Sequence, residues 1–348
     1  TFSASRTPRD DLLSESDEFL SIRGATNARR LLESGVTTAL DCGAPGETTF
    51  EVRKAQKEGL ISTSRLYLCG RPITTTGGHL AWMGEIADNS LEIKKSVRKL
   101  VGEGVDAIKV MVTGGQMTPN TLPETSYYTL DELETVASEA HKFGMVVVAH
   151  CLGTDGIEKA AIAGIDKIEH CAFFTPRGDE GYFRKYSQKV VNKIIDSGSY
   201  VTFGLSAGYL RNKELEREAA RGVAGAKEEL NWRKEEQGQM LEIFRRMSQA
   251  GVKMALGTDA GVTLTPFDDT YRELHLMNEN GMPPEEVIQA ATKNAARSIG
   301  KSSFLGTIEP TKRADIIGVK TNPLEDISAL AEVSFVMRDG EVIRKDCN

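Results

Sequence analysis

Short apolar runs alternate with amphipathic helical stretches along most of this chain, and the alternation restricts the fold more than any other feature of the sequence. Strands that alternate with helices indicate βα units and a parallel sheet. We expect seven buried strands, at residues 36–40, 65–69, 107–112, 145–150, 167–170, 200–204 and 252–257. Helices are expected between them, at residues 23–34, 49–58, 90–102, 130–143, 154–163, 183–197 and 227–250.

Seven strands in this rhythm are one short of a closed eight-stranded α/β barrel. The alternative is an open doubly wound sheet, which usually carries a GxGxxG loop after its first strand. Residues 41–46 read DCGAPG and do not match that loop. We therefore predict a (β/α)8 TIM-like barrel over residues 1–300 that lacks its first strand.

The rhythm changes after residue 300, where short strands are expected at 305–308, 314–320, 333–338 and 341–344. The pair Asp339-Gly340 between two of them predicts a tight hairpin. We predict that residues 301–348 form part of a small β-sandwich whose other strands, like the first barrel strand, would precede Thr1. A charged helical insertion at 211–238 is either a solvated excursion or a lid or oligomer contact.

Composition excludes several classes of protein. The 348 residues carry a formal net charge of −7, without a basic tract of the kind that binds nucleic acid. No apolar run approaches the roughly 20 residues that cross a bilayer. The five cysteines are scattered without a CxxC pair, so a disulfide scaffold is not expected. Localisation stays open, with the cytoplasm favoured by the expectation of reduced thiols.

Four polar residues stand at the carboxyl ends of four predicted strands, namely Lys109, His150, His170 and Asp259. Parallel strands present these ends at one mouth of a barrel, so the four side chains are expected to meet. A single histidine at a strand end is more often a packed core residue. Two imidazoles and a carboxylate together are the ligand types of Zn²⁺ or a similar divalent ion.

Lys109 lies inside an apolar strand, where burial should lower the pKa of its amine. A neutral amine can react with CO₂ to give an anionic carbamate that bridges two metal ions. The alternative is an ion pair with a neighbouring carboxylate, Asp106 or Glu169.

The motifs AIKVM, VVVAHC, KIEHC and GTDAG, in that order, resemble the amidohydrolase superfamily. The likeness is to its binuclear-metal branch, with imidazolonepropionase-like hydrolases and Xaa-Pro or Xaa-Arg/Lys dipeptidases and carboxypeptidases, and it extends to the tail motifs GTIEPTKRADIIGV and VMRDGEVI. It implies two divalent ions, expected to be Zn, bridged by carboxylated Lys109. It assigns His150 and His170 as metal ligands, and Asp259 as both ligand and proton shuttle.

One motif of the superfamily is missing. Its first strand ends in His-x-His, whereas none of the five histidines here are two residues apart. The motif would precede Thr1, so we expect the chain to be incomplete at that end. A barrel that is catalytically incomplete or non-catalytic is therefore kept as an alternative.

Further candidates for substrate contact follow other strands. His79 in TTTGGHL is similar to a Gly-Gly-His of related proteins and is expected to contact the substrate or the transition state. Tyr127, Tyr128, Arg177 and Arg211 could bind a substrate carboxylate, although exposed loop residues are the simpler interpretation.

The resemblance implies hydrolysis of an amide, most directly the C-terminal peptide bond of a dipeptide or an N-acyl amino acid. In this hypothesis a metal-activated hydroxide attacks the carbonyl, Asp259 transfers the proton, and His79 stabilises the oxyanion. The alternative substrate is a cyclic amide. The expected partners are a small-molecule or dipeptide substrate and further copies of the chain in a homo-oligomer.

Overall fold

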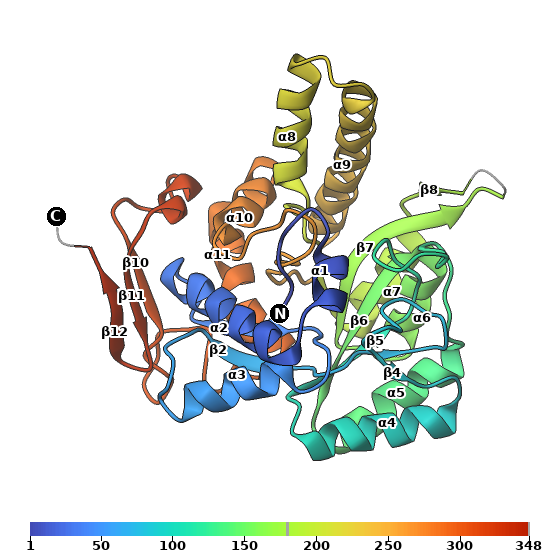
Figure 1. The fold of residues 1–348 in the computed structure, drawn as a ribbon, viewed down its shortest axis with the longest axis horizontal. Coiled ribbons are helices and arrows are strands. Elements are labelled where there is room, and N and C mark those ends of the chain that lie inside the picture. Colours follow the sequence, from blue (N-terminus) through green and yellow to red (C-terminus); the bar gives the residue numbers. More distant parts are fainter. Residues whose placement is uncertain (179–180, 347–348) are drawn as a thin grey trace.

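The computed structural model describes residues 1–178 and 181–346 (Figure 1). Its central strands are β1 (Thr38–Asp41), β2 (Arg65–Leu68), β3 (Ile73–Thr74), β4 (Glu85–Ile86), β5 (Ala107–Met111), β6 (Val146–Gly153), β7 (Lys167–Pro176), β8 (Tyr182–Arg184) and β9 (Tyr200–Thr202). The helices are α1 (Pro8–Ser14), α2 (Asp17–Glu33), α3 (Thr48–Lys57), α4 (Ser90–Glu103), α5 (Leu130–Lys142), α6 (Thr154–Ile162), α7 (Gln188–Ser197), α8 (Tyr209–Ala220), α9 (Ala226–Gln249), α10 (Thr270–Glu279), α11 (Pro284–Ala291) and α12 (Lys293–Ser298).

The parallel strands β5, β6, β7 and β9 follow one another in space in chain order, whereas β3 lies between β4 and β5. β1 pairs with β2, and β5, β6, β7 and β9 pair successively, all in parallel. The amide of Asp106 donates to the carbonyl of Leu68 over 2.7 Å and links the two groups of strands. The predicted parallel α/β architecture is therefore confirmed. Within the described residues the strands form separate two-stranded and seven-stranded sheets rather than one closed ring.

Three local predictions are wrong. Residues 252–257 form a single parallel bridge, between Met254 and Val201, instead of a strand. Residues 305–308 form no strand. The helix predicted from residue 183 begins at Gln188, because residues 182–184 form β8, which pairs with β7 in the antiparallel direction.

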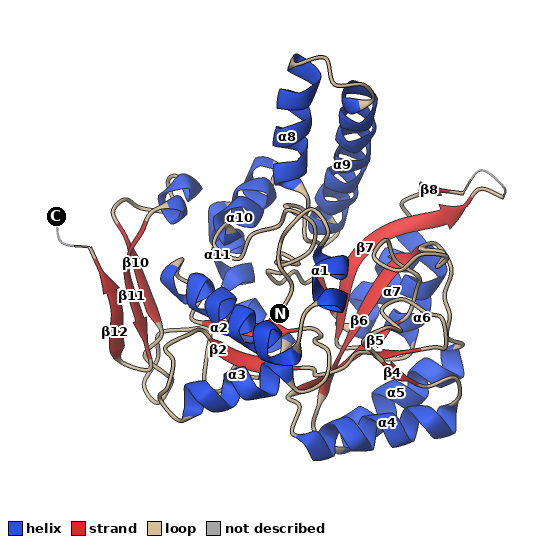
Figure 2. Ribbon diagram, in the orientation of Figure 1, coloured by secondary structure: helices blue, strands red, loops and turns tan. Residues whose placement is uncertain are grey.

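Helices α4 to α7 pack on the outer side of the parallel strands (Figure 2). All five residues of β5 are buried, as expected for a parallel strand that is covered on both faces. The hydroxyl of Thr129 and the carboxylate of Glu132 form a capping box that begins α5 immediately before its apolar face. The main buried apolar cluster of the described residues therefore lies between these strands and the helices that cover them.

The C-terminal segment forms an antiparallel sheet of β10 (Ile316–Val319), β11 (Val333–Arg338) and β12 (Glu341–Lys345), with a short 3₁₀ helix at Ile327–Ala331. The predicted hairpin at Asp339-Gly340 is confirmed. Both residues have positive φ, 53° and 83°, as a two-residue type I′ turn requires.

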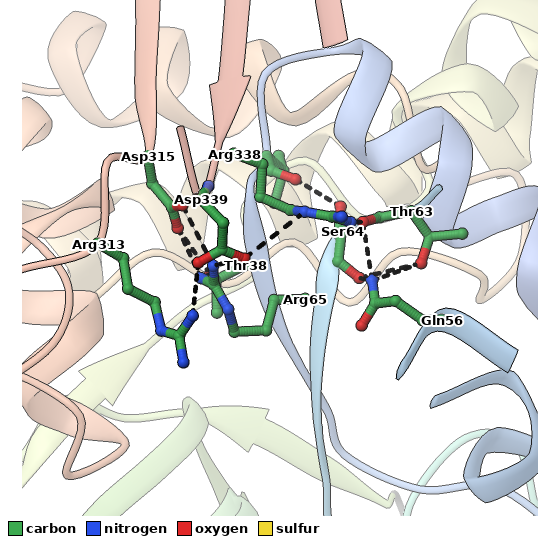
Figure 3. Close-up of polar contacts among 10 residues, drawn as sticks. Thr38, Gln56, Thr63, Ser64, Arg65, Arg313, Asp315, Arg338 and Asp339 are labelled. Carbon is green, nitrogen blue, oxygen red and sulfur yellow. Dashed lines mark hydrogen bonds and ion pairs between the residues drawn. The ribbon is translucent and has the colours of Figure 1, made fainter. Parts of the chain in front are cut away.

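Charged side chains attach this sheet to β2 (Figure 3). Arg65 of β2 lies 2.6 Å from a carboxylate oxygen of Asp315 and 2.6 Å from one of Asp339. Arg338 of β11 donates to the carbonyl of Thr63, just before β2. Arg65 and Asp315 are largely buried, so these contacts fix the sheet on the face beside β1 and β2.

The insertion predicted at residues 211–238 forms most of a helical pair, α8 and α9, which projects from the body of the molecule (Figure 1). Arg211 of α8 joins the two helices, since its guanidinium binds Glu218 on α8 and Glu229 on α9. No helix in the described part of the chain is long and apolar enough to cross a bilayer.

A candidate active site at the carboxyl ends of the strands

A cavity of about 980 Å³ extends from helix α2 and the C-terminal sheet to the carboxyl ends of the parallel strands. Residues from β1, β5, β6, β7 and the segment after Met254 line it. The lining includes the four predicted strand-end residues together with two others of the same region: Lys109, His150, His170, Asp259, His79 and Glu169. The structure thus brings to one place side chains that are up to 180 positions apart in the sequence (79 to 259).

Strand register explains why the histidines meet. Met111 of β5 pairs with His150 of β6, and Cys151 of β6 pairs with His170 of β7. The ring centroids of His150 and His170 are 4.7 Å apart, and those of His150 and His79 are 4.6 Å apart. The Nε2 atom of His150 lies 3.0 Å from the carbonyl oxygen of Gly114.

Two of the strand-end residues have a strained backbone. His170 has φ of 71° and Asp259 has φ of 55°, a region that non-glycine residues rarely occupy. Such conformations cost of the order of 1–3 kcal/mol each and tend to occur at functional sites. The strain therefore supports a functional role for both positions, and no motif in the sequence signals it.

The imidazoles of the cavity favour the neutral form. Burial lowers the pKa of His79 to about 3, and nearby His170 and Lys109 add to this effect. Burial likewise lowers the pKa of His150 and of His170, although Asp259 and Glu169 oppose the shift at His170. Neutral imidazoles are the form that binds metal ions or accepts a proton.

Lys109 is charged and paired. Burial lowers the pKa of its amine, but Glu169 and the thiols of Cys42 and Cys69 raise it above its ordinary value. The amine binds directly to the carboxylate of Glu169. The prediction that burial yields a neutral amine is therefore wrong for this arrangement, and the alternative ion pair with Glu169 is confirmed.

The other carboxylate weighed as a partner of Lys109 is engaged elsewhere, because Asp106 binds Arg53 at 2.7 Å. Glu169, which binds Lys109, directly precedes His170 in the motif KIEHC. The sequence did not show which of the two candidate carboxylates binds Lys109. The second carboxylate oxygen of Glu169 lies 3.5 Å from Lys167 and accepts from the thiol of Cys42 over 3.4 Å. Side chains two residues apart on a strand lie on the same face. This spacing could have identified the contact between Lys167 and Glu169 on β7 from the sequence.

Asp259 is a carboxylate that gains a proton more readily than usual. Burial raises its pKa, an effect that the nearby imidazole of His170 opposes and the charge of Glu169 reinforces. A carboxyl group shifted in this direction suits proton transfer near neutral pH.

A close backbone approach fixes the ring of His79. A Cβ atom added to Gly115 would lie 2.5 Å from Cε1 and Nε2 of that ring, so only glycine fits there. The hydroxyl of Thr74 donates to the carbonyl of His79 over 2.8 Å. The Nδ1 atom of His79 is buried and has no hydrogen-bond partner in the described structure, which leaves it available to a ligand.

The four weaker candidates lie outside the cavity lining. The hydroxyl of Tyr127 accepts a hydrogen bond from the amide of Leu122, and Tyr128 is buried with its hydroxyl donating to the carbonyl of Ala87. Arg211 is occupied by glutamates between α8 and α9. Arg177 stands at the far end of β7, where its amide donates to the carbonyl of Gly181.

A buried carboxylate, Glu273 of α10, supports the loop beside Asp259. It accepts hydrogen bonds from the amides of Leu205 and Ser206, at 2.9 and 2.7 Å. Burial nevertheless raises its pKa from 4.5 to about 7. The folded protein thus keeps this proton over a range in which the unfolded chain has lost it.

Glu273 is therefore expected to make stability fall as the pH rises from 4.5 to about 7. Above that range the difference is constant, because both states are ionised. Glu273→Gln removes the titration. The free energy of unfolding of the wild type minus that of the variant should decrease by up to about 3 kcal/mol across this range. Urea denaturation at several pH values measures it, and a flat difference would contradict the assignment.

Polar side chains gathered around one cavity, at the carboxyl ends of parallel strands, are typical of an enzyme of the α/β class. The model of the amidohydrolase family matches residues 1–343. The chain belongs to that family and is a hydrolase.

The relatives agree with this membership. The chain is similar to the ochratoxinase of Aspergillus niger, with 28% identity over 374 aligned positions that cover 96% of this chain and 72% of that protein. It is similar to a crystal structure of a Xaa-Pro dipeptidase with methionine bound in the active site, with a TM-score of 0.82, 30% identity, and coverage of 95% of this chain and 81% of that one. An imidazolonepropionase from Geobacillus kaustophilus is 38% identical over 78 positions, 21% of this chain and 18% of that protein.

The family generally binds divalent metal ions, and the donor chemistry of the cavity is compatible with one. It offers neutral imidazoles, the carboxylate of Asp259 and the buried, unpartnered Nδ1 of His79. The described residues nevertheless contain no group of three His, Cys, Asp or Glu side chains already at metal-binding spacing.

Proposed function

We propose that this hydrolase cleaves a linear amide, the C-terminal peptide bond of a dipeptide or of an N-acyl amino acid, with divalent metal as cofactor. One observation carries the proposal: Lys109, His150, His170 and Asp259 line the same cavity. The names of the relatives support the class of bond, since an ochratoxinase and a Xaa-Pro dipeptidase are among them.

We also propose how the two parts of the chain are built. Residues 1–300 would form a TIM-like barrel that lacks its first strand, with the parallel run β5, β6, β7 and β9 as part of its wall. Residues 301–348 would contribute strands to a small β-sandwich. Assembly into a homo-oligomer stays a prediction.

The residues that would hold metal are His150, His170, Asp259 and Lys109. Two divalent cations bound there, expected to be zinc, would polarise the scissile carbonyl and lower the pKa of water. Carboxylation of Lys109 by CO₂ would require its ammonium group to leave Glu169 and to release two protons to solvent, one to free the amine for attack and one as the carbamate forms. Lys167, 3.5 Å from the same glutamate, could then neutralise Glu169.

The chain's own groups would manage the proton and the developing charge. The carboxylate of Asp259, whose pKa burial raises, would accept a proton from the attacking water and return it to the leaving amine. His79, held against Gly115 and neutral at physiological pH, would donate a hydrogen bond to the oxyanion.

A substrate panel tests this function. Protein supplied with a divalent metal and bicarbonate is incubated with dipeptides, N-acyl amino acids and cyclic amides, and the released amine is quantified. We expect hydrolysis of the linear amides, loss of activity with a chelator, and recovery when metal is returned.

Two results would contradict the proposal in different ways. Hydrolysis of cyclic amides alone would favour the imidazolonepropionase-like alternative. The short alignment with an imidazolonepropionase is the observation that supports this alternative. Divalent metal that stays near zero per chain after reconstitution, together with no hydrolysis, would favour a non-catalytic protein.

A further inference from the structure

The helical pair α8–α9 brings one cation to the cavity that lacks an anionic partner. Five lysine and arginine residues line the cavity, and four of them bind carboxylates in the described structure: Lys109 and Lys167 bind Glu169, Arg184 binds Glu236, and Arg313 binds Asp339. The fifth, Arg233 of α9, forms no ion pair with any described residue.

Neutral acceptors hold Arg233 in place. Its Nε donates to the side-chain oxygen of Asn212 over 2.7 Å, and its Nη2 donates to the carbonyl of Gly208 over 3.2 Å. The amide of Asn212 in turn donates to Gln237 over 3.3 Å. Within the described chain the Nη1 of Arg233 makes no hydrogen bond, so the guanidinium keeps donors for a ligand.

The backbone makes room for this guanidinium. Gly208 has φ of 71°, and a Cβ added there would lie 2.3 Å from Nη2 of Arg233. Glycine is therefore needed both for the backbone conformation and for the approach of the side chain.

The same loop connects Arg233 to the reacting groups. A Cβ on Gly204 would lie 3.6 Å from Cβ of Asp259. The amide of Ala207 donates to the carbonyl of Gly204 over 3.1 Å, so residues 204–207 form a turn. Such a turn keeps the Cα atoms of Gly208 and Gly204 within about 11 Å of each other, so one short loop on the cavity wall contacts both Arg233 and Asp259.

Electrostatics favour an anion at this position. Arg233 is half-buried, and burial lowers its pKa while Arg211 adds repulsion. The acidic group that acts on it, Glu229, is bound to Arg211 at 2.9 Å. A half-buried guanidinium of this kind is stabilised when a carboxylate pairs with it, often through two parallel hydrogen bonds.

We propose that Arg233 binds the free carboxylate of the substrate, so that this hydrolase selects amides whose amine portion is an amino acid with an unblocked carboxylate. The inference rests on the proposed function and adds its specificity determinant. Lys109 and Lys167 already share Glu169, Arg184 is neutralised by Glu236, and Arg211 lies outside the cavity lining. Arg233 is therefore the cation of the cavity lining with which a substrate carboxylate would form an ion pair.

The test compares Arg233→Met with the wild type on N-acetyl-L-phenylalanine and on its carboxamide. Removing a charge-assisted hydrogen bond should raise KM for the carboxylate substrate on the order of 10-fold to 100-fold, with kcat nearly unchanged. The carboxamide should be a poor substrate for the wild type, and Arg233→Met should not worsen it. Arg233→Lys, which keeps the charge without the planar fork, should recover part of the loss.

Lys234→Met is the matched control, because Lys234 is the next residue on α9, carries the same charge, is exposed and lies outside the cavity lining. It should leave KM unchanged. Calorimetric binding of N-acetyl-L-phenylalanine to the metal-free protein gives a second readout, and affinity should fall for Arg233→Met alone. Equal affinity in the wild type and Arg233→Met, or equal use of carboxylate and carboxamide by an active wild type, would overturn the inference. No hydrolysis of any linear amide by the wild type would instead reject the proposed function.

Discussion

Asp259→Asn is expected to lower turnover on the order of 100-fold to 10,000-fold, the contribution typical of a positioned acid–base group. Asparagine has the shape of aspartate but cannot accept the proton of the attacking water. Burial raises the pKa of Asp259, so the folded state holds this carboxylate at a cost. The free energy of unfolding should therefore stay equal or increase in the variant, as is common when an active-site charge is removed.

The measurement is kcat on a linear amide that the wild type hydrolyses, with urea denaturation of the same preparations. Asp268→Asn is the matched control, since Asp268 undergoes the same chemical change but is exposed and outside the cavity lining. Its kcat should equal that of the wild type. Turnover of Asp259→Asn within a few-fold of the wild type would remove Asp259 from the proton pathway.

The sequence predicted that these side chains meet in one site, because the alternation of apolar runs and helices indicates parallel strands. His150 and His170 end apolar runs and Lys109 lies within one, and parallel strands present their carboxyl ends on one side. Asp259 was placed by the same argument, yet its segment forms only a bridge at Met254 rather than a strand. The sequence therefore predicted that Asp259 lies at the cavity, although it did not predict that residues 252–257 form only one bridge in place of a strand.

The sequence predicted less well which charged side chains form ion pairs. Whether Lys109 is neutral or charged depends on the orientation of Glu169, which comes from a different strand, and the sequence left both outcomes open. Arg211 and Arg233 lie on the same helical insertion, and composition does not distinguish them. Only the structure shows that glutamates occupy Arg211 while Arg233 reaches the cavity.

The second large effect is on stability and concerns the pair Lys109 and Glu169. Their side chains are 3% and 14% exposed, so neither ion is well hydrated. Glu169→Gln leaves a buried ammonium without its carboxylate, and we expect the free energy of unfolding to fall by about 3–5 kcal/mol. Lys109→Met should cost less, because Glu169 keeps Lys167 at 3.5 Å.

A double-mutant cycle separates this pairing from general damage to the core. If the large effect of Glu169→Gln arises from an unpaired charge at Lys109, then adding Lys109→Met should restore much of the lost stability, because the ammonium is gone. Urea denaturation of the four proteins at pH 7 gives the coupling energy between the two side chains. Strictly additive losses would mean that the pair does not stabilise this core.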